Sequence, residues 1–150
     1  MKKIITVVLL AFVVICSCCA EEFKGFLGIP FGSSKAYALT TMNKKGWDFR
    51  ISDSKTYHFF GKQYAGKDVD EIMFSFQGDL LQSVVVVVNH DDALEIFNAM
   101  SRKYEFIYFE GTPYYASSDK KAVFSLIDSG LAIIDGSMLT KPKSTMESDI

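Results

Sequence analysis

Residues 71–89 of this chain read EIMFSFQGDLLQSVVVVVN. In the first part, Ile72, Phe74 and Phe76 recur at every second position, which places them on one face of an extended strand. A Gly-Asp turn and a run of valines at residues 84–88 follow, and β-branched residues of this kind favour strands. The stretch predicts an antiparallel hairpin. Because its second strand is apolar on both faces, we expect that strand to lie centrally in a sheet or to be covered by another layer.

The alternation extends to the preceding segment. Residues 56–60 place Tyr57 and Phe59 on one face, so they predict a third strand of the same antiparallel sheet. On the neighbouring strands, we expect Phe74 and Val86 to point inward, toward the helices. A charged residue in place of Val86 would then be buried without a partner and would prevent folding.

Two other segments have helical periodicity. The first covers residues 34–45, where Ser33 or Ser34 provides an N-cap and Gly46 follows a pair of lysines at the end. The second covers residues 92–104 and begins after acidic capping residues. Their apolar stripes consist of Ala36, Leu39 and Met42 in the first helix, and of Ala93, Ile96, Phe97, Met100 and Tyr104 in the second.

The whole chain predicts an α+β fold with two helices packed on an antiparallel sheet. Each helix is followed by a run of strands. Two tandem helix-plus-β-meander units are one interpretation of this order, and chance similarity of two amphipathic helices is the other. The remaining predicted strands cover residues 23–31, 106–109, 113–116, 122–127 and 131–134.

The N-terminus has the pattern of a secretory signal. Lys2 and Lys3 precede an apolar run at residues 4–15, and small residues follow it. That run is shorter than the roughly 20 residues that a membrane-spanning helix needs. We therefore expect residues 1–20 to be a signal peptide, residues 21–136 to form one domain, and residues 137–150 to be a flexible tail.

Two processing routes are open at the end of this signal. Residues 15–18 resemble a bacterial lipobox, which favours lipidation at Cys18 and a membrane-anchored lipoprotein of the cell envelope. The alternative is cleavage after Ala20, which would release a soluble periplasmic or secreted protein. All three cysteines lie before residue 20, so the domain must fold without disulfides.

Charge and motifs exclude several classes of function. No more than two basic residues are adjacent, whereas nucleic-acid binding needs a basic stripe. The two histidines, His58 and His90, have no nucleophile motif beside them. The acidic residues near positions 68–71 and 90–92 do not form a converging set of metal ligands. We expect no enzyme activity, no cofactor and no metal site.

Aromatic residues crowd the stretch around residues 106–115. Large rings are enriched at protein interfaces, which makes Tyr108, Tyr114 and Tyr115 the candidate protein-binding residues. The alternative is that half of the rings in this stretch complete the core beneath the second helix.

The motif Gly28-Ile29-Pro30-Phe31-Gly32-Ser33, the helix end Lys44-Lys45-Gly46-Trp47 and the following meander resemble a known family. They are similar to small bacterial envelope proteins and lipoproteins with the β-lactamase-inhibitor-protein-like fold. The resemblance implies a protein-binding scaffold without catalytic residues. This chain lacks the disulfides that some members carry, so inhibitor activity and individual functional residues are not transferred.

These observations favour a non-enzymatic envelope protein that binds another envelope or secreted protein. One alternative is an inhibitor of a secreted hydrolase, and another is a carrier of a small apolar ligand held between helix and sheet. Membrane association would come only from a lipid on Cys18, and no nucleic-acid partner is expected.

Overall fold

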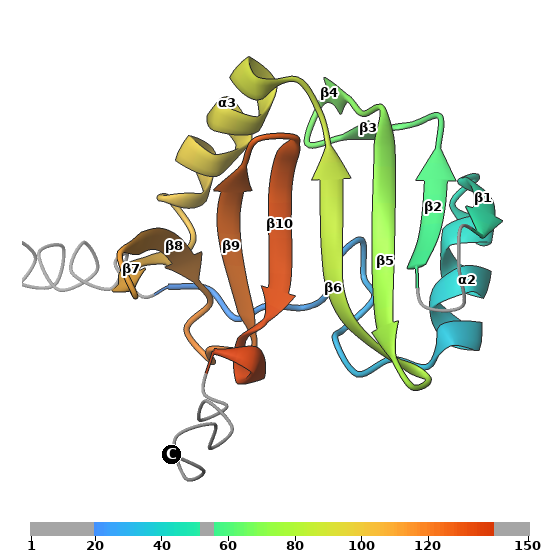
Figure 1. Cartoon of the computed structure of the whole chain (residues 1–150), viewed down its shortest axis with the longest axis horizontal. Coiled ribbons are helices and arrows are strands. Elements are labelled where there is room, and N and C mark those ends of the chain that lie inside the picture. Colours follow the sequence, from blue (N-terminus) through green and yellow to red (C-terminus); the bar gives the residue numbers. More distant parts are fainter. Residues whose placement is uncertain (1–19, 52–55, 140–150) are drawn as a thin grey trace, which may run out of the picture.

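The computed structural model describes residues 20–51 and 56–139 of the 150-residue chain. It has an α+β fold in which a large antiparallel sheet dominates and two α-helices form a smaller part (Figure 1). The eight strands of this sheet follow the order β1-β2-β5-β6-β10-β9-β8-β7, and β3 and β4 form a separate hairpin. The elements are α2 (Lys35–Lys44), β1 (Asp48–Ile51), β2 (Thr56–Phe60), β3 (Gln63–Tyr64), β4 (Lys67–Asp68), β5 (Glu71–Gln77), β6 (Leu80–Val87), α3 (His90–Met100), β7 (Glu105–Phe109), β8 (Thr112–Ala116), β9 (Ala122–Ile127) and β10 (Gly130–Asp135).

The predicted central hairpin is confirmed. β6 lies in the middle of the sheet between β5 and β10, and Phe74 is paired with Val84 across β5 and β6. Both Phe74 and Val86 have no exposed surface. Because both helices pack on this face, the alternate residues Val85 and Val87 on the opposite face are only half-buried.

Both predicted helices form, but their bounds and some of their buried residues differ from the prediction. In α2, the side chain of Ser34 accepts the backbone N–H of Tyr37 at 3.2 Å and caps the helix. Its buried residues are Ala38 and Met42, four positions apart on one face. The expectation for Ala36 is wrong, since this residue is exposed.

The second helix, α3, begins two residues earlier than predicted and ends earlier as well. Asn89 caps it, because its side chain accepts the N–H of Asp92 at 2.9 Å and donates to the carboxylate of the same residue at 2.5 Å. The predicted stripe is otherwise confirmed, with four buried residues: Ala93, Ile96, Phe97 and Met100.

The predicted strand at residues 23–31 is wrong. Gly25, Leu27 and Gly28 have φ angles of 110°, 50° and 84°, which no extended strand contains. The backbone instead folds back on itself, and Phe26 and Ile29 exchange two hydrogen bonds of 2.9 Å. This tight turn lets both side chains enter the core, where Phe26 is 2% exposed and Ile29 is fully buried.

The structure adds elements that the pattern did not predict. β1 pairs with β2, and all four of its residues are exposed, so burial imposes no alternation on its sequence. β3 and β4 form a short hairpin whose turn has positive φ at Ala65 (51°) and Gly66 (77°), the geometry of a type I′ turn.

The four later strands match the predicted segments, and β10 ends in a short 3-10 helix, η2 (Gly136–Met138). Residues 1–19 and 140–150, which include Cys18 and most of the expected tail, lie outside the described residues. None of the helices in residues 20–51 and 56–139 has the length and apolar character needed to cross a membrane.

Candidate functional site

The β7–β8 hairpin places the three candidate tyrosines in different surroundings. Tyr108 is 69% exposed and lies on β7, with Phe106 of the same strand 56% exposed. Tyr114 and Tyr115, on β8, are half-buried. The ring of Tyr115 lies 4.8 Å from that of Phe97 on α3 and packs against the core. Tyr108 is therefore the candidate with the most accessible ring.

β7 is the outermost strand on its side of the sheet (Figure 1). Its hairpin closes through Glu110 and Gly111, whose φ angles of 48° and 83° match a two-residue type I′ turn. In such a hairpin the pair that flanks the turn is hydrogen-bonded, and every second pair after it is as well. This alternation directs the backbone N–H and C=O groups of Phe106 and Tyr108 toward the outer edge, where no other described strand pairs with β7.

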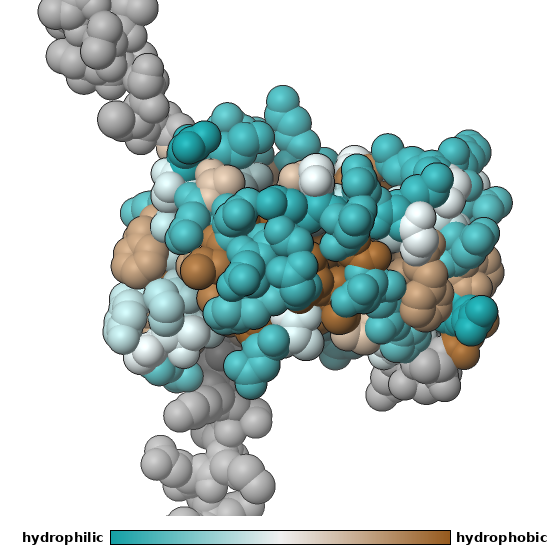
Figure 2. All heavy atoms as spheres, turned by 90° about the horizontal axis from the view of Figure 1, so that it is seen from above, coloured by the Kyte–Doolittle hydropathy of each residue, from teal (hydrophilic) through white to brown (hydrophobic). Residues whose placement is uncertain are grey.

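The opposite edge of the sheet, β1, differs in its side chains. It carries Asp48 and Arg50, and charges on an edge strand discourage pairing with another chain. On β7, the sole charged residue is Glu105 at the start of the strand, where it pairs with Lys120 at 2.5 Å. Seen from above, hydrophobic side chains are visible at both ends of the molecule and between polar side chains in the middle (Figure 2).

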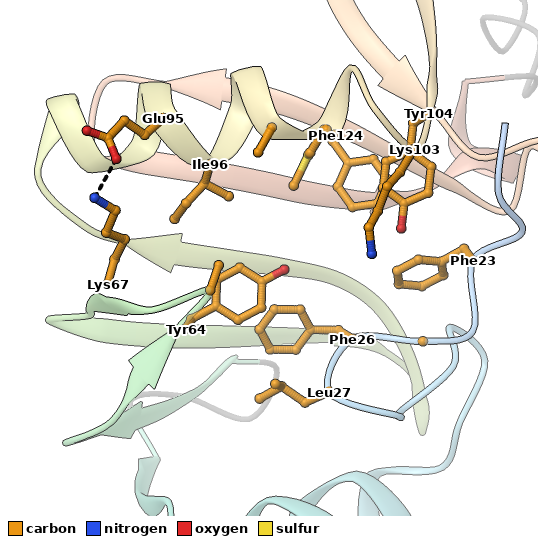
Figure 3. Close-up of a pocket in the computed structure, with 14 residues that line it drawn as sticks. Phe23, Phe26, Leu27, Tyr64, Lys67, Glu95, Ile96, Lys103, Tyr104 and Phe124 are labelled. Atoms are coloured by element: carbon orange, nitrogen blue, oxygen red, sulfur yellow. Dashed lines mark ion pairs between the residues drawn. The ribbon is translucent and has the colours of Figure 1, made fainter. Parts of the chain in front are cut away.

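A second feature is a pocket between α3, the β3–β4 hairpin and the N-terminal segment (Figure 3). Its volume is about 360 Å³, which falls in the roughly 300–1,000 Å³ range of small-molecule sites. Most of its lining is apolar. The lining side chains include Phe23, Phe26, Leu27, Ile96, Met100 and Phe124.

Three polar groups point into this pocket, one from the β3–β4 hairpin and two from the segment just after α3. They are the hydroxyls of Tyr64 and Tyr104 and the amine of Lys103, all visible in the gap between α3 and the N-terminal segment (Figure 3). Burial and the nearby Tyr104 raise the pKa of Tyr64 to about 12. Burial, Glu21 and Asp119 also raise the pKa of Tyr104. Both phenols are therefore neutral hydrogen-bond donors at pH 7.

An ion-pair cluster closes the other end of the pocket. Lys67 of β4 contacts Glu95 at 2.5 Å and Asp92 at 3.0 Å, both on α3. The hydrogen bonds that Lys67 donates to Glu95 and Asp92 raise the pKa of Lys67, and the hydrogen bonds that Asp92 accepts from Lys67 and Asn89 lower the pKa of Asp92. The cluster ties the hairpin to the helix, so the pocket has a fixed wall on this side.

The structure does not bring the histidines and acidic residues considered in the sequence analysis together into one site. His58 lies on the sheet face opposite the helices and pairs with Glu71 of the neighbouring strand. His90 is the first residue of α3 and stands beside Asp91 and Asp92, in the region where acidic capping residues were expected. In the part of the chain that the structure describes, no group of three or more His, Cys, Asp and Glu side chains could hold a metal ion.

Sequence reasoning missed the pocket because its walls come from four separate segments. Tyr64 and Lys67 stand in a hairpin that has no periodic pattern, and Phe23 was assigned to a strand. Of the lining residues, Ile96, Met100 and Tyr104 were singled out, but only as members of a helical stripe. No local signal in the sequence indicates that these residues meet.

Comparison with known proteins adds no assignment to this geometry. No protein-family model matches the chain, and neither a curated protein nor a solved structure matches it significantly.

Proposed function

We propose that this chain is an exported, non-enzymatic binding module of the cell envelope, and that it binds another envelope or secreted protein along the free edge of β7. The exposed edge strand, with its three exposed aromatic rings of Phe106, Tyr108 and Phe109, carries this proposal. The signal-like N-terminus supports export, and Cys18 is the proposed site of lipid attachment.

The occupant that fits this edge is an extended segment of the partner. An unpaired edge offers backbone donors and acceptors that an added strand can use, a recognised mode of protein binding. At β7 these groups belong to Phe106 and Tyr108, the residues whose rings are also most exposed. The backbone would supply affinity, and the rings would select the side chains of the added strand.

The strand order supports a finer proposal about the fold. We propose that the domain consists of two helix-plus-β-meander units. α2 precedes β1, β2, β5 and β6, α3 precedes β7 to β10, and the last strands of the two runs pair in the middle. Two co-expressed fragments, divided between β6 and α3, should then assemble into a folded pair. Fragments that remain unfolded together would contradict the proposal.

The experiment that tests the edge uses photo-crosslinking in cells that express the full chain. A photoreactive residue at Phe109, beside the proposed interface, should give a discrete product with one other protein. The matched control places the same residue at Phe49 on β1, which is exposed to a similar extent: 43%, against 38% for Phe109. Products of equal yield from both edges would contradict the proposal, and so would a product with the mass of two copies of this chain.

Two substitutions at Tyr108 then separate the ring from the backbone. Tyr108→Pro removes the outward N–H without touching the hairpin ladder, since proline is tolerated on an edge strand when its N–H would face solvent. Tyr108→Ser removes only the ring. We expect the crosslinked product to fall about tenfold with Pro and by a smaller factor with Ser. Tyr108→Ser should also change the free energy of unfolding by less than about 0.5 kcal/mol, as is usual for surface substitutions. An undiminished product with Pro would overturn strand addition.

A further inference from the structure

The pocket beneath α3 has the composition of a small-molecule site rather than of a packing defect. A void in a core is normally lined by apolar groups alone, whereas this one also contains the hydroxyls of Tyr64 and Tyr104. The two residues lie on the β3–β4 hairpin and just after α3, and their hydroxyls point into the same space (Figure 3). Tyr64 as a whole is half-buried, and its hydroxyl lies in the pocket as a neutral donor (Figure 3). A ligand in the pocket could accept a hydrogen bond from this donor.

Charge distinguishes the two ends of the pocket. Of the two lysines that line it, Lys67 is held by Asp92 and Glu95. Among the residues that the structure describes, Lys103 forms an ion pair only with Glu21, at 3.9 Å and with side chains 60% and 61% exposed, so solvent weakens this pair. A negative group in the pocket could replace Glu21 as the partner of Lys103.

We propose that this pocket binds a small amphipathic carboxylate, with its hydrocarbon body among the apolar lining residues and its carboxylate at Lys103, Tyr104 and Tyr64. A singly charged head group fits better than a phosphate, because one available ammonium and two neutral hydroxyls face it. This site is separate from the β7 edge and does not depend on the proposed function.

The probe for this proposal is a series of linear carboxylates titrated calorimetrically into the protein purified from cells that express the full chain. Burying one more methylene should tighten binding about fourfold. We therefore expect affinity to rise steadily from octanoate to dodecanoate, and to level off once the chain fills the pocket. Dodecanol and dodecyltrimethylammonium should bind at least tenfold more weakly than dodecanoate, since they lack the negative head group.

Pocket variants test the position of the ligand. Ala99 lines the pocket and is exposed on α3, so Ala99→Trp should fill the space and abolish dodecanoate binding without unfolding the helix. The neighbouring residue Asn98 is also exposed but does not line the pocket, and Asn98→Trp should bind as the wild type does. Thermal melting of both variants confirms that each is folded.

Head-group variants test the role of charge. Lys103→Met should weaken dodecanoate binding by about tenfold, the usual range for loss of a hydrogen bond to a charged group. Dodecanol binding should not change. The matched control is Arg102→Met, which removes a neighbouring exposed cation that does not line the pocket. A further variant, Glu21→Gln, should tighten dodecanoate binding because it removes the carboxylate that competes for Lys103.

The outcomes are decisive in either direction. Absence of dodecanoate binding to the wild type would overturn the proposal, and so would equal binding by Ala99→Trp or by the cationic amphiphile. Tyr108→Pro should leave dodecanoate affinity unchanged, and Ala99→Trp should leave the crosslinked product unchanged. Failure at one site is therefore distinguishable from failure at the other.

Discussion

The two helices lie on the same sheet, yet the space beneath them is filled to different degrees. Beneath α2, Met42, Phe59 and Phe74 have no exposed surface, and the rings of Phe59 and Phe74 lie 4.9 Å apart. Beneath α3, Ile96 and Met100 also face inward, but they line a pocket of about 360 Å³. The first half is closed, and the second is open toward the N-terminal segment.

The difference follows from what meets the helix in each half. In the closed half, side chains from regular neighbouring strands interdigitate, since register places rings such as Tyr57 and Phe74 directly opposite each other. In the open half, α3 meets a folded-back N-terminal segment and a two-residue-per-strand hairpin. The side chains of an irregular segment do not recur at regular intervals. They therefore cannot fit into the grooves between the side chains of a helix along its whole length. A ligand-binding site forms more readily where incomplete packing leaves a pocket.

The largest expected effect comes from removing one ring in each half. Phe74→Ala creates a sealed cavity in the closed half and should lower the free energy of unfolding by about 3–5 kcal/mol. Phe23→Ala should cost less than half as much, because Phe23 is half-buried and the new space joins an existing pocket. Urea denaturation of both variants measures the difference. Equal costs would mean that the second half is packed as tightly as the first.

The helix caps should differ by a smaller amount. Asn89 makes two hydrogen bonds with Asp92, whereas Ser34 accepts one from Tyr37 at 3.2 Å. Asn89→Ala should therefore lower the free energy of unfolding by about 1–2 kcal/mol, and Ser34→Ala by about 0.5–1 kcal/mol. The same denaturation assay compares them. The reverse order would indicate that α2 depends more on its cap, and α3 more on its packing.

The last effect concerns Tyr64, is absent at neutral pH and appears only in alkaline solution. Burial and the nearby Tyr104 raise its pKa to about 12 in the folded protein, from the ordinary value of 10.0. A raised pKa means that the folded state favours the neutral phenol, so this contribution to stability is complete below pH 10 and is lost as the pH rises toward 12. Tyr64→Phe should show a shallower fall in stability between pH 10 and 12 than the wild type. Parallel curves for the two proteins would place the Tyr64 hydroxyl in water and not in the pocket.

Local sequence patterns determined most of the regular structure of this protein. The alternation in residues 71–77 and the valine run correctly predicted the central hairpin and the burial of Phe74 and Val86. Periodicity also predicted both helices, because burial on one face imposes a repeat on the residues that form it. Short runs of apolar and aromatic residues predicted the four later strands. Elements without a buried face, such as β1, left no repeat to detect.

Only the tertiary structure decided where the two candidate sites lie. The exposure of Tyr108 and the half-burial of Tyr115 depend on β7 being the last strand of the sheet, which alternation along one strand does not indicate. The pocket depends on Tyr64, Tyr104 and the N-terminal segment meeting beneath α3, although they are far apart in the sequence. Periodicity reports which face of an element is buried, whereas contacts between distant elements depend on strand order and on how completely their surfaces interlock.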